Sequence, residues 1–304
     1  MHIDIVVLHY KNRDDTLCCL QSLFANTYRD FTVHLVNNGT TDTFPEMPRV
    51  IYYLLPVNLG FAGGNNHVLR LLQEGATSFL LLNNDTWVPP DYLEKLALWA
   101  TNHPGIIGSK IVLYDDPHTL DHYGGIWDSE RLTFDLIGYR QSSHETALPL
   151  DRLDYVTGCS LFAPTSALRA VGLLDEGYFL YFEEADWCLQ AKRAGIPISV
   201  CPDAVVHHKV SRAVTNPSVT KKYYFWRNRL RYIRKNIAPS PFQRRILQEI
   251  GRLLLTLFLK EVHYLLLFPW TTPQRRLIRR TRIQGYVASL SGIFDYLKNP
   301  LNEL

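Results

Sequence analysis

Apolar residues in the first hundred positions form runs of two kinds, which alternate along the chain. Residues 3–10 are a β-rich run that ends in polar side chains, whereas residues 14–26 carry apolar side chains at helical spacing. A second helical stretch follows the glycine-rich segment 58–66 and ends near Glu74. Further strand-like runs lie at 31–36, 50–54 and 78–82. Strands that alternate with helices predict a mostly parallel central α/β sheet flanked by helices, with its ligand at the carboxyl ends of the strands.

The pattern is less regular after residue 90. Residues 91–102 predict an amphipathic helix and residues 106–113 a strand. Residues 114–153 are polar with scattered aromatic side chains and predict no regular element, so this segment is either a flap over a binding site or a long surface loop. Order returns with a predicted strand at 155–163, a short helix that ends at Val171 and a helix that begins near Glu183.

Two apolar runs end abruptly in polar side chains that can bind a metal. Leu80-Leu81-Leu82 is followed by Asn83, Asn84 and Asp85, and the run 204–206 is followed by His207 and His208. One carboxylate and one imidazole at strand ends can share a divalent cation. Because adjacent strand residues point to opposite faces, the strand phase decides which histidine is the ligand, and the sequence leaves that choice open.

A third motif is a cluster of carboxylates behind the aromatic run 178–182. Glu183, Glu184 and Asp186 lie within four positions, where like charges raise one another's pKa and can produce a general base. The alternative is the acidic first turn of a helix, which the macrodipole favours. On a helix, neighbours are about 100° apart, so Glu183 and Glu184 cannot serve the same point, whereas Glu183 and Asp186 share a face.

The glycine-rich segment Gly60-Phe61-Ala62-Gly63-Gly64 narrows the choice of ligand. It matches neither the GxGxxG fingerprint of dinucleotide-binding folds nor the GKS or GKT end of a Walker loop. Its predicted use is a close approach of the backbone to a ligand at the start of a helix.

The charge of the chain is unevenly distributed. The chain of 304 residues has a net charge of only +3. Sixteen of its 32 Lys and Arg residues nevertheless lie between 221 and 282, a segment that contains only two acidic residues. Such asymmetry indicates an anionic surface as partner. The five cysteines show no CxxC spacing, which predicts reduced thiols in a reducing compartment, and the N-terminus resembles no signal peptide.

The basic last third predicts helices. Aromatic and basic residues interleave at 221–232, but no recognised nucleic-acid module accompanies them, so we expect no nucleic-acid partner. The apolar runs 253–259 and 264–268 are separated by charged residues and are too short for a clean membrane span. They predict amphipathic helices on an anionic membrane surface, and the alternative is a helical bundle packed on the preceding α/β domain or a second subunit. The neighbouring basic cluster consists of Arg275, Arg276, Arg279, Arg280 and Arg282.

The order and spacing of these motifs resemble the inverting glycosyltransferases of family 2, which have the GT-A (Rossmann-like) fold. The resemblance is strongest to the rhamnosyltransferase-like branch, which builds bacterial surface polysaccharides. The segments that carry it are 6–12, 36–39, 58–66, 82–85, 157–159, 179–187 and 207–208. We expect a catalytic domain at 1–215, with a nucleotide-sugar half at about 1–113 and an acceptor half at about 114–215, and a helical, membrane-associating region at 216–304.

The resemblance implies roles for individual residues. Glu184 would be the catalytic base, supported by Glu183 and Asp186, and Trp187 would face the acceptor. Asp85 would bind Mg²⁺ or Mn²⁺ on the donor diphosphate, and His207 matches the histidine that completes this metal site. Contacts to the nucleotide sugar are implied for His9, Tyr10, Asn12, Asn37, Asn38, Gly60, Asn65, Asn66, Asn83, Asn84 and Asp85.

The implied reaction is the metal-dependent, inverting transfer of a sugar to a glycan or a lipid-linked glycan. dTDP-rhamnose is the first donor to expect and a UDP-sugar the second, with the enzyme cytoplasmic and peripheral on the inner face of the cell membrane. The oligomeric state is open between a monomer and a homo-oligomer.

Asn37 and Asn83 replace aspartates of most family members and lose a charge. The competing interpretation is therefore a non-catalytic nucleotide-sugar-binding or assembly subunit of a polysaccharide synthesis complex.

Overall fold

The computed structural model describes residues 1–145, 148–210, 217–237 and 273–298, together with positions 248, 250, 251, 255 and 259. The chain divides into two compact units, Met1–Ala213 and Val214–Leu304, and this division lies beside the expected boundary at 215. The predicted apolar runs 253–259 and 264–268 lie outside the described residues except for Leu255 and Leu259. In the described part of the chain, every helix is too short or too polar to cross a membrane.

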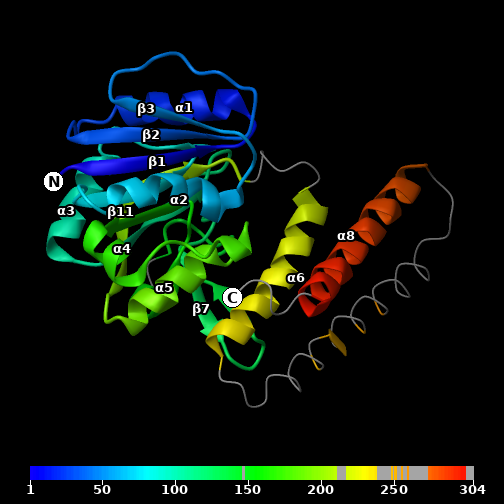
Figure 1. Ribbon diagram of the computed structural model, residues 1–304. Coiled ribbons are helices and arrows are strands. Elements are labelled where there is room, and N and C mark those ends of the chain that lie inside the picture. Colours follow the sequence, from blue (N-terminus) through cyan, green and yellow to red (C-terminus); the bar gives the residue numbers. More distant parts are fainter. Residues whose placement is uncertain are drawn as a thin grey trace. The chain divides into compact units, whose positions relative to one another are not determined.

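An eight-stranded sheet forms the centre of the first unit, with the strand order β3-β2-β1-β4-β10-β6-β11-β5 (Figure 1). Strands β1, β2, β3 and β4 are parallel neighbours, as are β6 and β11, whereas β10 and β5 run antiparallel to the strands beside them. The predicted mostly parallel α/β architecture is thereby confirmed. The strands are β1 (Ile3–His9), β2 (Phe31–Asn38), β3 (Val50–Leu55), β4 (Ser78–Asn83), β5 (Thr86–Trp87), β6 (Ile106–Leu113), β10 (Ser160–Pro164) and β11 (Ile198–His208).

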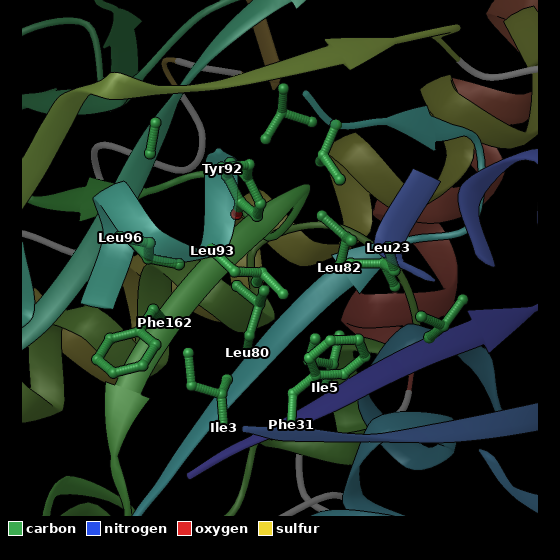
Figure 2. Packing of buried hydrophobic residues seen from close by; sticks show 14 of the residues in the cluster. Ile3, Ile5, Leu23, Phe31, Leu80, Leu82, Tyr92, Leu93, Leu96 and Phe162 are labelled. Carbon is green, nitrogen blue, oxygen red and sulfur yellow. The ribbon is translucent and has the colours of Figure 1, made fainter. Parts of the chain in front are cut away.

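The core lies between this sheet and two helices. Side chains such as Ile5 and Leu80 from the sheet pack with Leu23 of α1 and Tyr92 and Leu93 of α3, all of them buried (Figure 2). Because β1 is covered on both faces, almost all of its residues are buried, which is why it appears in the sequence as a continuous apolar run. The helices of this unit are α1 (Arg13–Phe24), α2 (Gly60–Leu72), α3 (Tyr92–Asn102), α4 (Thr165–Val171) and α5 (Glu183–Arg193).

A second, three-stranded sheet occupies part of the segment that predicted no regular element. It consists of β7 (Gly124–Asp128), β8 (Thr133–Leu136) and β9 (Tyr155–Val156) in the order β8-β7-β9. The single strand predicted at 155–163 is therefore wrong, because Thr157 accepts a backbone hydrogen bond from Ser160 (3.3 Å) and turns the chain from β9 into β10. The ring of Phe134 packs edge-to-face on Tyr155, with ring centroids 4.7 Å apart, and its centroid lies 6.1 Å from that of Phe182, just before α5.

The described part of the second unit contains α6 (Pro217–Asn236) and α8 (Pro273–Lys298), which pack on each other. A Cβ at Gly292 of α8 would lie 2.4 Å from the carbonyl oxygen of Tyr223, so the glycine permits the close approach of the two helices. The Tyr223 hydroxyl donates to Asp295 (2.9 Å), and Leu230 and Ile293 are buried between the helices. The predicted helical character of this region is correct for its described residues.

Candidate active site

Strand pairing brings the two metal-binding motifs of the sequence together. His208 of β11 pairs with Thr86 of β5, so Asp85, which directly precedes β5, lies next to the end of β11. Nε2 of His208 is 3.3 Å from Oδ1 of Asp85, and the main-chain nitrogen of Lys209 donates to the Asp85 carbonyl (2.9 Å). The ring of His207 instead packs edge-on against Trp87, with centroids 5.0 Å apart. The structure thus places His208 beside Asp85 and does not support the predicted metal role of His207, because the alternation of the strand turns that side chain to the other face.

A carboxylate that the sequence analysis missed lies on the other edge of the same imidazole. Oδ2 of Asp121 is 2.8 Å from Nδ1 of His208. Burial alone would raise the pKa of Asp121, but the hydrogen bonds and charges of His122 and His208 lower it far below its ordinary value. The only signal in the sequence was an acidic residue and a histidine just before Gly124-Gly125 in a polar segment.

Asp85, Asp121 and His208 form a cluster, and the charges within it also shift the pKa values of Asp85 and His208. Burial would raise the pKa of Asp85, yet the charge and hydrogen bond of His208 and the charge of Lys209 outweigh it, so the pKa is lowered. Burial would lower the pKa of His208, but the Cys159 sulfur, Asp85 and Asp121 raise it well above its usual value. The cluster therefore favours ionised carboxylates around a positive centre.

Lys209 adds a second cation beside these groups. Its Nζ lies 2.6 Å from Oδ1 of Asp15 in the first turn of α1 and 4.9 Å from the ring centroid of Tyr114. Burial alone would lower its pKa, but the hydrogen bond to Asp15 and nearby negative groups raise it, so the lysine stays charged. A charged lysine at this edge suits a ligand that carries phosphate groups.

The residues around Asp85 can be tested for their fit to the divalent cation that the fold family implies. Carboxylate oxygen is a donor for Mn²⁺ and Mg²⁺ alike, imidazole is a donor of transition-metal sites, and both lie in one largely buried cluster. The described residues contain no group of three or more His, Cys, Asp or Glu side chains arranged to hold an ion. The donor set fits a cation whose remaining ligands come from a bound diphosphate.

The acidic turn before α5 has a strained backbone. Phe179, Tyr181 and Phe182 all have positive φ angles (62°, 70° and 78°), which non-glycine residues rarely adopt and which cluster at functional sites. The turn places Glu183 and Glu184 in the first turn of α5, as the sequence predicted.

The two glutamates differ in exposure. Glu183 is 3 % exposed, whereas Glu184 is half-buried. Burial raises the pKa of both, and the charge of Glu184 raises that of Glu183 further, while backbone N–H groups and His122 partly offset the effect at Glu184. Oε2 of each is buried and has no hydrogen-bond partner among the described residues.

Tyr181 is influenced by the charges of both the acidic turn and Asp85. Burial raises the pKa of this tyrosine to about 12, and the charges of Glu183, Glu184 and Asp85 contribute to the shift. The acidic pair and Asp85 therefore act on one side chain, although about a hundred residues separate them in the sequence. A Cβ at Gly158 would lie 3.7 Å from the Cβ of Glu184, and the carbonyl of Cys159 accepts from the main-chain nitrogen of Asn83 (3.0 Å), so the acidic turn lies near the end of β4.

The glycine-rich segment holds the acidic turn in place. The main-chain nitrogen of Phe61 donates to the carbonyl of Phe179 (2.6 Å), and a Cβ at Gly60 would lie 2.3 Å from that oxygen. Asn66 donates to the carbonyl of Leu174 (2.8 Å) and accepts from its main-chain nitrogen (3.0 Å). These contacts give Gly60 and Asn66 a structural role, and their contact with a ligand stays a prediction.

Two further predicted site residues have structural contacts. Asn65 is buried and donates to the carbonyl of Phe61 (2.9 Å) within α2. Trp187 is 3 % exposed, donates to the carbonyl of Gly172 (2.8 Å) and packs edge-on against Phe79. The structure does not support the predicted acceptor contact of Trp187, because the helix turns its ring into the core. Asp186 accepts from the hydroxyl of Tyr178 (3.4 Å) and so supports the same turn.

A polar network lies at the carboxyl ends of β1 and β2. His9 contacts Thr16 (2.7 Å) through Nδ1 and Asp42 (2.9 Å) through Nε2, while Asn84 donates to Thr16 (2.8 Å). Burial lowers the pKa of His9, although Asp42 opposes this. Asn37 donates to the carbonyl of Asp42 (2.8 Å), so the network joins both strand ends. The sequence analysis missed Asp42 and Thr16, because nothing in the local pattern separated them from ordinary loop and helix polar residues.

The other predicted nucleotide-sugar residues lie at the same edge. Asn38 donates to Asn58 (2.9 Å) and to the carbonyl of Gly60 (3.0 Å), which ties β2 to the start of α2. Asn12 has a positive φ of 54° in the turn between β1 and α1, and Tyr10 lies under the Lys11 ammonium (5.1 Å to the ring centroid). Asn83 ends β4. Ligand contact stays a prediction for all four residues.

Comparisons with known proteins agree with this arrangement. The chain matches the model of glycosyl transferase family 2 over residues 4–162. It is 24 % identical to the dTDP-rhamnosyl transferase RfbF of Shigella flexneri over 68 % of this chain and 72 % of that protein. It is 28 % identical to the N-acetylglucosaminyl-diphospho-decaprenol L-rhamnosyltransferase of Mycobacterium tuberculosis, over 66 % of this chain and 73 % of that protein.

The fold has a counterpart among solved structures. A mannosyltransferase from Pyrobaculum calidifontis, solved in complex with GDP-Man and Mn²⁺, superposes with a TM-score of 0.58 at 13 % identity, over 97 % of this chain and 87 % of that one. At this identity the likeness concerns the fold, and it supports the expected GT-A architecture. The family match, the rhamnosyltransferase relatives and the fold together show that the chain belongs to glycosyltransferase family 2 and is a glycosyltransferase of the rhamnosyltransferase-like type.

Proposed function

We propose that this enzyme transfers rhamnose from dTDP-rhamnose to a lipid-linked glycan, with inversion at the anomeric carbon and with a divalent cation. The observation that carries the proposal is the closeness of Asp85 and His208 to the acidic pair of α5: a Cβ at Gly158 would lie 3.7 Å from Glu184, and the next residue, Cys159, bonds Asn83 just before Asp85. Two acidic sites, one for the leaving group and one for the attacking hydroxyl, are what an inverting transfer requires. The names of the relatives support rhamnose, and a UDP-sugar is the second candidate donor.

Asp85 and His208 are the residues that would hold Mn²⁺ or Mg²⁺, and His208 would release its Nε2 proton on binding the cation. When bound, the cation supplies positive charge that stabilises the leaving nucleoside diphosphate. Lys209 lies beside these residues and adds a fixed positive charge of the protein for the same phosphates.

Glu184 is the base that this geometry favours. It is half-buried, whereas Glu183 is 3 % exposed, so Glu184 has the better access to an incoming hydroxyl. A carboxylate whose pKa is raised by burial holds a proton better at neutral pH and is a stronger base than an exposed one. The carboxylate accepts the proton of the acceptor hydroxyl as its oxygen attacks the anomeric carbon from the side opposite the leaving group. Glu183 and Asp186 hold the turn that positions it.

The network of His9, Asn37 and Asp42 is the proposed contact surface for the nucleoside. It lies at the carboxyl ends of β1 and β2, where ligands of parallel α/β sheets bind. Asp42 supplies a carboxylate close to Asn37, the position at which most family members have an aspartate.

The helical unit supports a membrane location for the acceptor. Val287, Phe294 and Leu297 of α8 are exposed large apolar side chains, and the sequence of 221–282 is strongly basic. Basic helices with exposed apolar residues bind anionic lipid surfaces. We expect the full chain to sediment with vesicles that contain phosphatidylglycerol and to stay in solution with pure phosphatidylcholine. Equal partition with both kinds of vesicle would contradict this part of the proposal.

The enzyme can be tested by incubation with a panel of nucleotide sugars, with Mn²⁺ or Mg²⁺ or with a chelator. We expect metal-dependent turnover of dTDP-rhamnose that is lost in Asp85→Ala and in Glu184→Gln, with donor binding kept in Glu184→Gln. Asp151→Ala and Glu130→Gln, which change exposed residues, are the matched controls. Turnover that survives both active-site changes would refute the assigned roles, and turnover of a UDP-sugar alone would replace the donor.

A further inference from the structure

Asp121 is a buried carboxylate that the reaction described above does not yet use. It is 5 % exposed and comes from the segment between β6 and β7, far in sequence from Asp85 and from His208. Its Oδ2 lies 2.8 Å from Nδ1 of His208, whereas Oδ1 of Asp85 lies 3.3 Å from Nε2 of the same ring. The imidazole therefore lies between two carboxylates that reach it from opposite edges.

The carboxylate of Asp121 is not required to hold its own segment. The main-chain nitrogen of Asp121 donates to the carbonyl of Ile111 in β6 (2.9 Å). On either side, the main-chain nitrogen of Leu120 donates to Gln141 (2.9 Å) and that of Tyr123 to Ile137 (3.0 Å). Because these backbone bonds fix the path of the chain, the side chain is available for a different task, and its closest partner is His208.

The geometry excludes Asp121 as a ligand that shares one ion with Asp85 in this arrangement. The two carboxylates contact different nitrogens of the histidine ring, and the described residues contain no group of three His, Cys, Asp or Glu side chains arranged around one ion. Asp121 can act on the metal site through the imidazole of His208, and its other oxygen, Oδ1, lies 3.6 Å from Nδ1 of His122. A carboxylate on one ring nitrogen fixes the tautomer and the orientation of a histidine and makes the other nitrogen a better metal ligand.

We propose that Asp121 is a positioning residue of the metal site: it accepts the Nδ1–H of His208 and thereby directs Nε2 towards a divalent cation held by Asp85. The proposal rests on the metal dependence proposed above. Asp121 is also a second carboxylate in the cluster. Acting through His208, it compensates for the negative charge that is missing because Asn83 replaces the aspartate of most family members.

The test measures Mn²⁺ affinity from the electron paramagnetic resonance signal of the free ion, with dTDP or UDP present. Wild type is compared with Asp121→Asn, which keeps the shape of the side chain and removes its charge, and with Asp151→Asn as an exposed control. We expect the Kd for Mn²⁺ to rise about 10–100-fold in Asp121→Asn and to stay unchanged in Asp151→Asn. Nucleotide affinity without metal should stay the same in all three proteins, which a merely misfolded variant would not show.

A second measurement uses the wild-type protein alone. Nitrogen-15 NMR of its histidines, with dTDP and Mg²⁺, reports which ring nitrogen of His208 carries the proton, and we expect the proton on Nδ1. An unchanged Mn²⁺ affinity in Asp121→Asn, or a proton on Nε2, would overturn the proposal. If wild type binds no Mn²⁺ with either nucleotide, the proposed metal dependence fails, and this inference fails with it. If wild type binds Mn²⁺ but Asp121→Asn binds it equally well, only the inference about Asp121 fails.

Discussion

The contact between Gly60 and the acidic turn predicts a large and specific effect of one methyl group. Gly60 has a φ of +73°, and a Cβ at this position would lie 2.3 Å from the carbonyl oxygen of Phe179. In Gly60→Ala the left-handed backbone alone costs about 1–2 kcal/mol. The clash also separates that carbonyl from the main-chain nitrogen of Phe61, which now bonds it at 2.6 Å, and a buried unpaired group costs about 1–3 kcal/mol. We therefore expect the free energy of unfolding to fall by about 2–5 kcal/mol.

Two other glycines separate these contributions. Gly195 has a similar φ of +77° with no heavy atom within 4 Å of a Cβ, so Gly195→Ala should cost only the backbone part, about 1–2 kcal/mol. Gly75 has neither a positive φ nor a neighbour within 4 Å, and Gly75→Ala should be neutral or stabilise the protein by about 0.4–1 kcal/mol.

Urea unfolding followed by tryptophan fluorescence measures all three variants, and turnover of the donor measures the effect on the site. Only Gly60→Ala should lower kcat, because the Phe179 carbonyl belongs to the turn that positions Glu184. If Gly60→Ala and Gly195→Ala lose the same free energy within about 0.5 kcal/mol, the clash is absent and the reasoning is refuted.

Two further predictions concern the same turn. Burial, and then the charge of Glu184, raise the pKa of Glu183 in the folded protein well above 4.5. The ionised form of Glu183 is therefore disfavoured in the folded state but not in the unfolded chain. The free energy of unfolding should consequently fall as the pH rises above 4.5 and should level off beyond the pKa of the folded state. Urea unfolding at pH 5 and pH 8 should show a smaller difference for Glu183→Gln than for wild type, and an unchanged difference would contradict the assignment. Asn66→Ala should lower the free energy of unfolding by about 2–3 kcal/mol, because Leu174 loses partners for both its main-chain groups. Thermal unfolding beside an Asn102→Ala control, at an exposed helix end, checks this, and equal midpoints would exclude it.

Local sequence patterns were sufficient for most of the catalytic unit. Strands covered on both faces appear as continuous apolar runs, so β1, β2 and β4 were predicted close to their observed bounds. The carboxylates of α5 were predicted from helical geometry, and the observed burial of Glu183 and partial exposure of Glu184 agree with the expected divergence of neighbours. Asp85 was recognised because it follows a buried strand.

Two of the predictions that were not supported depended on which way a side chain points, and a third on a turn of the backbone. Trp187 follows the acidic motif directly in sequence, yet its ring lies in the core against Phe79. His207 and His208 are indistinguishable in a local pattern, and the pairing of β11 with β5 determines which of them faces Asp85. The turn at Thr157 was hidden inside an apolar run, because the chain changes from one sheet to the other without a strong turn signal.

The sequence by itself determined the fold class, the order of the elements in the first hundred residues and the two acidic motifs, because these depend on periodicities that each segment carries alone. Only the tertiary structure decided the composition of the site. Asp121 contacts His208 from a segment that has no regular sequence pattern. The charge of Asp85 contributes to the raised pKa of Tyr181, although about a hundred residues separate the two in the sequence. Strand order, register and side-chain direction produce these contacts, and they arise from packing across the whole sheet rather than from any local run of residues.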